Sequence, residues 1–262
     1  MAASLIRLPV LLGAMPWLSS EHFKVSKPRI VLLGDSITVG CRETGVTAQT
    51  TYPSCLKTLL DRGGVNVELI VSALHGVYMD YAVRRFERMV GRHKPDYVVI
   101  LLGANDAVPA GSNAVTSPED FQTSLETLVR KCVFQGVIPI IASPPPRSDT
   151  RCCELLRSYA KAAGAFAAKA GLPFVDLFTR LNKERFLNEL LPDCQHPTPA
   201  ANGIIAELIA ETFMQVAEIC RRPVASTALA GSRTLESISP LQHLQSIFPY
   251  SPSTRQEDVA TY

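Results

Sequence analysis

Residues that could do chemistry stand in three short stretches, far apart in this 262-residue sequence. Ser36 follows the apolar run RIVLLG, and Asn105 follows the apolar run DYVVILLG. His196 stands in the segment LPDCQHPTPAANG, with Asp193 three residues before it. A serine hydroxyl is a weak nucleophile that becomes reactive beside a general base, and the base needs a third group to orient it. Serine, histidine and aspartate are the residue types that such a site requires.

We predict that Ser36 acts as a nucleophile and His196 as its base, while Asp193 holds the imidazole and stabilises its charged form. Attack on a carbonyl group develops an oxyanion, which needs preorganised N–H donors. The backbone amides of Ser36 and of Gly76 in SALHGV, and the side-chain amide of Asn105, can supply three. This set of groups favours nucleophilic acyl transfer.

The hydrophobic pattern predicts a scaffold that brings these residues together. Short, nearly continuous apolar runs alternate with amphipathic stretches, which is typical of a parallel sheet covered by helices on both faces. We therefore predict an α/β fold, a three-layer α/β/α sandwich with a mainly parallel five-stranded sheet. Right-handed crossovers place the carboxyl ends of all strands at one edge, where ligands bind. The strands are expected at 29–34, 66–72, 96–103, 136–143 and 172–177, and helices near 52–62, 79–92, 118–134 and 151–170.

Two helices carry start signals in the sequence. Ser117 before Pro118 is typical of an N-cap followed by proline in the first turn. Thr198 and Pro199 give the same signal for the helix that follows His196. The positive end of that helix favours a neutral imidazole, whereas Asp193 favours the charged form, and a balance near neutrality suits a general base.

Three of these stretches resemble sequence blocks of the SGNH (GDSL-like) hydrolase superfamily. Gly34-Asp35-Ser36-Ile37 is similar to the first block, although the family often has leucine at the fourth position. Gly103-Ala104-Asn105-Asp106 is similar to the third block, and Asp193-Cys194-Gln195-His196 to the fifth. The resemblance covers about residues 28–218. It departs at the second block, where SALHGVYMD lacks the asparagine that many members carry before a glycine, and Gly76 is the best match.

The resemblance implies a flavodoxin-like (SGNH hydrolase) fold and cleavage of carboxylic esters through an acyl-serine intermediate, without a metal or cofactor. By that similarity Ser36 is the nucleophile, His196 the base and Asp193 its partner, and Gly76 and Asn105 complete the oxyanion hole. There is no G-x-S-x-G around the serine, which argues against an α/β-hydrolase elbow.

Five further residues are expected to bind substrate. Asp35 and Ile37 flank the serine. His75, next to the second block, either lines the pocket or is an ordinary loop histidine. Pro144 and Pro145 follow the fourth predicted strand and form either a stiff pocket wall or a simply rigid loop.

The composition excludes several other classes of protein. Apolar residues make up 47% of the chain and charged residues 19%, which is enough for a sizeable core. The net charge of +2 includes no basic block, so neither nucleic acid nor an anionic membrane surface is an expected partner. The seven cysteines include no C-x-x-C pair, so no zinc site is predicted.

We divide the chain into an N-terminal extension at 1–27, a hydrolase-like domain at 28–222 and a tail at 223–262. The extension has the composition of a possible targeting segment, whereas the odd number of cysteines slightly favours the cytoplasm. The tail is rich in Pro, Ser and Thr, which favours a mostly disordered segment. The alternative is that its stretch LESISPLQHLQSIF, with apolar residues three apart, forms a short helix that docks on the body. No apolar run reaches 18 residues, so no membrane-spanning helix is expected.

The expected substrate is a small-molecule ester with a short or small acyl group, because no long apolar lid segment is apparent. Lysophospholipids, thioesters and O-acetylated sugars remain open as alternatives on the same site. A catalytically inactive binding or scaffold module is a rival from another class. A flavodoxin-like nucleotide binder is a second rival, but the first predicted strand is not followed by a phosphate-binding glycine loop. The oligomeric state is left open.

Overall fold

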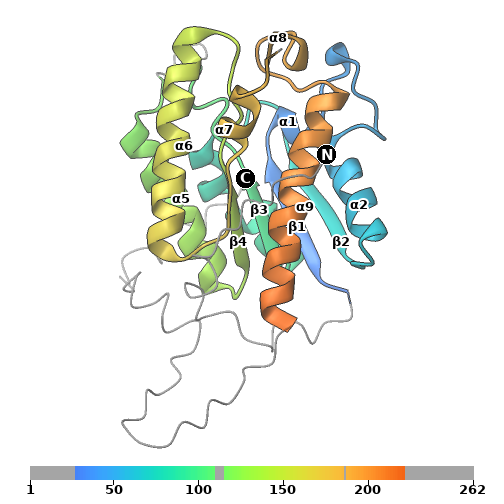
Figure 1. Ribbon diagram of the computed structural model, residues 1–262. Helices are drawn as coiled ribbons and strands as arrows, with labels where there is room; N and C mark the ends of the chain where they lie inside the picture. Colours follow the sequence, from blue (N-terminus) through green and yellow to red (C-terminus); the bar gives the residue numbers. More distant parts are fainter. Residues whose placement is uncertain (1–26, 110–114, 186, 222–262) are drawn as a thin grey trace, which may run out of the picture.

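The computed structural model of this protein describes residues 27–109, 115–185 and 187–221, and Figure 1 shows their arrangement. The predicted N-terminal extension lies outside the described residues except for Lys27, and the predicted tail lies outside them entirely. The described residues thus cover nearly all of the predicted hydrolase-like domain.

A five-stranded sheet forms the middle layer, with the strand order β2-β1-β3-β4-β5. Every neighbouring pair of strands runs parallel. The chain passes from β1 outward to β2 on one side and returns to β3 on the other, so β1 marks the topological switch point where such sheets bind ligands. The strands are β1 (Arg29–Gly34), β2 (Glu68–Ala73), β3 (Tyr97–Leu101), β4 (Ile138–Ala142) and β5 (Phe174–Val175).

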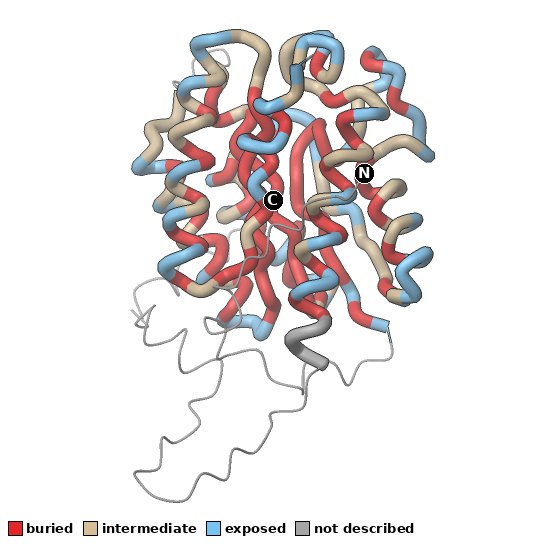
Figure 2. The backbone as a smooth tube through the Cα atoms, viewed as in Figure 1, coloured by how far each residue is buried: buried red, intermediate tan, exposed pale blue. Residues whose placement is uncertain are grey.

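Helices cover both faces of the sheet. α2 packs against α9, and α5 packs against both α3 and α6. The two groups lie on opposite sides of the strands in Figure 1, and Figure 2 shows the buried strands between them. This confirms the predicted three-layer sandwich. The helices are α1 (Ser36–Val39), η3 (Arg42–Thr44), α2 (Tyr52–Arg62), α3 (Met79–Arg84), α4 (Phe86–Met89), η4 (Gly91–His93), α5 (Pro118–Phe134), α6 (Thr150–Ala170), α7 (Leu177–Asn182), α8 (Leu187–Leu190) and α9 (Pro199–Arg221).

The burial of the strands explains their sequence pattern. β3 and β4 are buried along their whole length, and β1 is buried from its second residue. β2 lies at the sheet edge, and its Val71 is 51% exposed. The strands predicted at 96–103 and 172–177 are longer than β3 and β5. β3 ends where Gly103 turns the chain with a φ of 117°, and β5 ends because Asp176 caps the next helix with its side chain.

The start signal for α5 is confirmed in detail. The helix begins at Pro118, and the Ser117 side chain accepts a hydrogen bond of 3.0 Å from the Asp120 amide. The helix predicted at 79–92 is wrong as one element, because Arg85 and Val90 leave helical dihedral angles and divide it into α3, α4 and η4.

The helix after the histidine begins at Pro199 as predicted, but Thr198 does not cap it. The buried Thr198 hydroxyl finds no hydrogen-bond partner among the described residues. Its backbone carbonyl instead accepts from the Asn202 amide at 2.9 Å, while its own amide donates to Leu190. The side chain is thus turned into the protein and away from the first amides of α9. No helix in the described ranges has the length and apolar character needed to cross a membrane.

Gly34, the last residue of β1, has no room for a side chain. A Cβ atom there would overlap the Thr38 hydroxyl and would lie 3.2 Å from the Leu101 carbonyl oxygen. Thr38 is held in place because its hydroxyl lies 3.0 Å from the hydroxyl of the buried Tyr52. The missing Cβ therefore lets β1 pass directly into α1, which carries Ser36.

Gly34→Ala is expected to lower the free energy of unfolding by about 1 to 3 kcal/mol, the usual effect of overpacking a core. Urea unfolding of both proteins measures the change. Gly203→Ala in α9 is the matched control, because its added Cβ would meet no atom within 4 Å apart from the neighbouring helix backbone, and alanine favours a helix. Equal effects of the two substitutions would contradict the close approach assigned to the β1–α1 turn.

Candidate active site

The three predicted stretches meet at the carboxyl edge of the sheet. Ser36 is the first residue of α1 and is only 5% exposed. Asp35 precedes it as the N-cap, and its carboxylate accepts a hydrogen bond of 2.9 Å from the Ile37 amide. His196 comes from the loop between α8 and α9, far from β1 in the sequence. The sheet thus brings a serine and a histidine from distant segments into contact.

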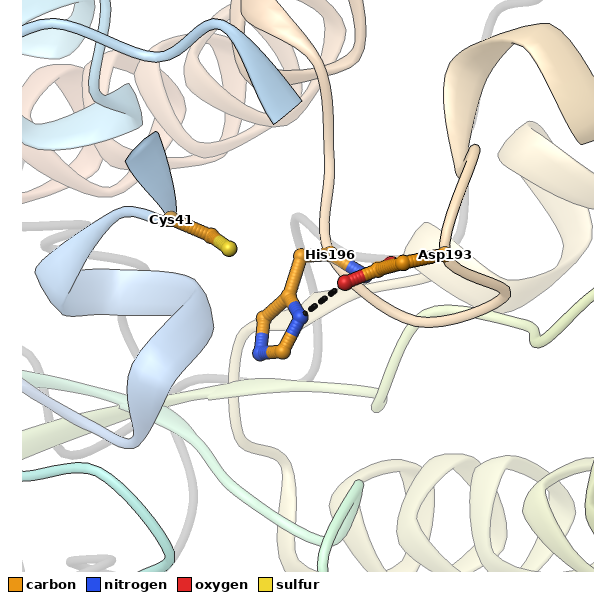
Figure 3. Close-up of side chains that lie close together, drawn as sticks. All are labelled: Cys41, Asp193 and His196. Atoms are coloured by element: carbon orange, nitrogen blue, oxygen red, sulfur yellow. Dashed lines mark hydrogen bonds and ion pairs between the residues drawn. The ribbon is translucent and has the colours of Figure 1, made fainter. Parts of the chain in front are cut away.

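Ser36, His196 and Asp193 form a continuous hydrogen-bonded chain. His196 Nε2 lies 2.9 Å from Ser36 Oγ, and His196 Nδ1 lies 2.6 Å from Asp193 Oδ2. Figure 3 shows the carboxylate of Asp193 meeting the imidazole ring. The imidazole can accept a proton at one nitrogen while the carboxylate stabilises the other, which is the geometry that activates a serine.

Asp193 is fixed by its own loop. Its Oδ1 accepts hydrogen bonds from the His196 amide at 2.7 Å and from the Gln195 amide at 3.0 Å. Partial burial alone would raise the pKa of Asp193, but the hydrogen bonds from His196 and Gln195 outweigh it and hold the pKa below its usual range. The carboxylate therefore stays ionised beside the imidazole at neutral pH.

Two of the predicted oxyanion donors, Gly76 and Asn105, lie in the loops after β2 and β3. Asn105 Nδ2 donates to the Val77 carbonyl at 3.1 Å and to Asp35 Oδ2 at 3.3 Å, so the asparagine links the loops after β2 and β3 to the turn after β1. Gly76 is exposed, and its φ of 74° favours glycine. Within the described ranges, neither the Gly76 amide nor the Ser36 amide donates a backbone hydrogen bond.

Asp35 and Ile37, which flank the serine, are buried. Both are 1% exposed, and the Asp35 carboxylate is occupied by the Ile37 amide and by Asn105. Capping α1 thus occupies the Asp35 carboxylate, and a contact of either residue with substrate stays a prediction. Asp35 thus fixes the first turn of α1, on which Ser36 lies.

The other expected substrate-binding residues divide into two groups. His75 is exposed and borders an open hollow of about 440 Å³. Pro144 and Pro145 are buried after β4, and Pro144 lies beside Gly103 in the loop that leads to Asn105. The rest of the hollow is lined by residues 39–43, 46–48 and 51, between α1 and α2. This segment follows the serine directly in the sequence. It has no periodic pattern of apolar residues, so no other feature of the sequence indicated that it lines a hollow.

The sequence did not predict a set of hydrogen bonds between the loop after β4 and the loop that carries His196. The guanidinium of Arg147 hydrogen-bonds to Asp149 and to the side-chain oxygen of Gln195. The Ser148 amide donates to the Cys194 carbonyl at 3.2 Å. The loop after β4 thereby holds the segment that carries Asp193 and His196. No local pattern predicts such a contact, because it joins residues 48 apart.

Cys41 is the other nucleophilic side chain near the histidine. Its thiol donates to Glu43 Oε2 at 3.1 Å. Partial burial and this hydrogen bond raise the pKa of the Cys41 thiol above its ordinary value, so the thiol stays protonated at neutral pH. Ser36 and not Cys41 is hydrogen-bonded to His196 Nε2.

Two buried acids position the loops of the site. Asp106, 2% exposed, accepts from the Met79 amide with both carboxylate oxygens, at 3.1 and 3.2 Å. The Tyr159 hydroxyl donates to the Asp106 carbonyl at 3.1 Å. Burial raises the pKa of Asp35 to about 7 and that of Asp106 to about 6.

Several known proteins are similar to this chain in sequence or in fold. An arylesterase of Vibrio mimicus is 23% identical over 189 residues, which are 71% of this chain and 88% of that protein. A lipase/acylhydrolase from Enterococcus faecalis has a TM-score of 0.62 at 26% identity, over 74% of this chain and 95% of that one. An acetylxylan esterase from Geobacillus stearothermophilus has a TM-score of 0.60 at 20% identity, over 72% and 93%.

Residues 32–204, more than half of the chain, match the GDSL-like Lipase/Acylhydrolase family. The protein therefore belongs to this family and is an SGNH-type carboxylic ester hydrolase.

The burial of Asp106 predicts a pH-dependent stability. Its raised pKa means that the folded state prefers the protonated carboxyl, so this contribution is complete below about pH 4 and is lost as the pH rises through about 6. In Asp106→Asn the amide oxygen can still accept from Met79 without a charge. Between pH 4.5 and 7.5, the variant should gain on the order of 1 to 3 kcal/mol relative to wild type.

Urea unfolding across this pH range measures the difference. Asp61→Asn is the control, because Asp61 is exposed on α2 and its ion pair with Lys57 lies in solvent, where such a pair contributes little, so the two stability curves should stay parallel. Parallel curves for Asp106→Asn as well would contradict the assigned burial effect.

Proposed function

We propose that the protein hydrolyses esters in two steps through an acyl-serine intermediate. Ser36 Oγ attacks the ester carbonyl while His196 Nε2 takes its proton, and the imidazolium then returns the proton to the leaving alcohol. Water then attacks the acyl carbon while the same imidazole takes its proton. The bond from the acyl carbon to Ser36 Oγ breaks, the imidazolium returns the proton to Oγ, and the acid leaves. The observation that carries this proposal is the aligned chain from Ser36 to Asp193, with contacts of 2.9 and 2.6 Å.

The backbone amides of Ser36 and Gly76 and the side-chain amide of Asn105 stabilise the oxyanion. The two backbone amides point to no other backbone acceptor among the described residues. Asn105 can keep its bond to the Val77 carbonyl and exchange the longer one, to Asp35, for the developing oxyanion. A preorganised donor of this kind is typically worth about 10² to 10³ in kcat.

The proposed substrates carry short or small acyl groups. The hollow beside the site holds about 440 Å³ and mixes polar side chains such as Arg42, Glu43 and Thr47 with small apolar ones. The names of two similar proteins, an arylesterase and an acetylxylan esterase, also denote ester cleavage. An O-acetylated sugar is a second candidate, because one of the similar proteins is an acetylxylan esterase. Lysophospholipids and thioesters are the remaining alternatives for the same site.

Ser36→Ala is expected to remove ester hydrolysis while leaving the fold intact. Without the nucleophile, a triad typically keeps about 10³ to 10⁴-fold catalysis over water, far below the intact enzyme. The measurement is hydrolysis of p-nitrophenyl esters from acetate to palmitate, together with acetate release from acetylated xylan. We expect acetate or butyrate to give the highest kcat/KM.

The control for this experiment is Ser158→Ala, a serine on the outer part of α6 whose loss should leave the rates unchanged. A wild-type protein inactive toward every ester would favour the inactive binding module. Wild-type rates in Ser36→Ala would refute the mechanism.

Asn105→Ala is expected to lower kcat by about 10² to 10³ with little change in KM, the effect of losing one oxyanion donor. Steady-state kinetics on p-nitrophenyl acetate provide the test. A rise confined to KM would assign Asn105 to substrate binding and remove it from the oxyanion hole.

A further inference from the structure

Cys41 brings a third kind of metal ligand to the histidine and aspartate of the site. One ligand atom from each of Cys41, Asp193 and His196 lies within 4.8 Å of the other two. Figure 3 shows the sulfur pointing toward the imidazole ring from the loop opposite Asp193. No role in ester hydrolysis needs a thiol at this place.

The two loops that supply these ligands are tied together. Cys41 is the N-cap of η3, and the buried Thr44 at the end of this turn has its hydroxyl 2.9 Å from the Cys41 carbonyl oxygen. The same hydroxyl lies 3.0 Å from the carbonyl oxygen of Pro197, the residue after His196. The convergence of sulfur and imidazole is therefore built into the fold.

The ligand types select for zinc. Thiolate, imidazole and carboxylate are the three groups that Zn²⁺ takes in proteins, at about 2.0 to 2.3 Å, so ligand atoms around one ion lie roughly 3 to 4 Å apart. The three ligand atoms all lie within 4.8 Å of one another, which is close to that range. Glu43, whose Oε2 lies 3.1 Å from the sulfur, is placed to be a fourth ligand. Mg²⁺ and Ca²⁺ prefer all-oxygen sites.

We propose that Cys41, Asp193 and His196 form a zinc-binding site that switches the hydrolase off, with Glu43 or a water molecule as the fourth ligand. The ion replaces the thiol proton, so binding forms a Zn–S bond and releases one H⁺ to solvent. Coordination at His196 Nε2 occupies the lone pair that faces Ser36, and coordination at Nδ1 breaks the bond to Asp193. Either mode interrupts the hydrogen-bonded chain.

The absence of C-x-x-C pairs argues only against a zinc site whose ligands come from one short segment. It does not bear on a site whose ligands come from two segments, one with Cys41 and the other with Asp193 and His196. Zinc binding itself does not depend on the proposed function, whereas the inhibition does, and the two can be measured separately.

The experiment titrates the full-length protein with zinc chloride by calorimetry and follows p-nitrophenyl acetate hydrolysis in parallel. We expect one ion per chain and inhibition that EDTA reverses. Cys41→Ser should weaken zinc binding by at least about 100-fold, since loss of even an outer-shell partner costs about 10- to 100-fold. Inhibition is expressed relative to the uninhibited rate of each variant. Cys55→Ser on α2 is the matched control and should keep the wild-type affinity.

Ser36→Ala should bind zinc as wild type does, because the serine is not a ligand. One outcome separates the two proposals: Ser36→Ala binds zinc, Cys41→Ser does not, and wild type hydrolyses no ester. That result would refute the proposed function but would support the metal site. Equal zinc affinities of wild type and Cys41→Ser would overturn the site, as would no binding by wild type in a protein that hydrolyses esters. Co²⁺ offers a second readout, since a thiolate–cobalt charge-transfer band should appear in wild type and be missing in Cys41→Ser.

Discussion

The hydrogen bond between Ser36 Oγ and His196 Nε2 joins residues that lie 160 positions apart, and the rest of the structure is arranged to keep it at 2.9 Å. Ser36 is placed by β1 at the switch point of the sheet, and His196 by the loop that opens α9. Burial of the strands and of α9 fixes both elements against one core. A contact of this length tolerates little error, so the packing of α9 on the sheet bears directly on the chemistry.

Buried polar groups hold the loops of the active site in place against the hydrophobic core. Asp35 and Asp106 lie buried behind the site, where water cannot solvate their charges, and burial raises the pKa of each. The Asp35 carboxylate orients α1 and Asn105, and the Asp106 carboxylate fixes the start of α3. Burying these two carboxylates lowers the stability of the fold but holds the loops of the site in place. The Arg147 contact to Gln195 holds the histidine loop in the same way, from the loop after β4.

The sequence predicted the fold because burial in a parallel sheet leaves a direct trace, a run of apolar residues, as in β3 and β4. It predicted the meeting of Ser36, Asp193 and His196 because carboxyl ends of parallel strands share one edge. It could not predict the inward turn of Asp35, which depends on the cap of α1, or the break at Arg85 within a regular apolar pattern. The position of Cys41 beside His196 depends on how two irregular loops pack, and no local pattern records that.

Mapping the residue that an organophosphonate labels tests the central claim most directly. The full-length protein is treated with a fluorophosphonate, digested and examined by peptide mass spectrometry. We expect one adduct per chain, on the hydroxyl of Ser36, and its loss in His196→Ala because the serine then has no base. Labelling of another residue such as Cys41, or equal labelling of wild type and His196→Ala, would contradict the proposed mechanism.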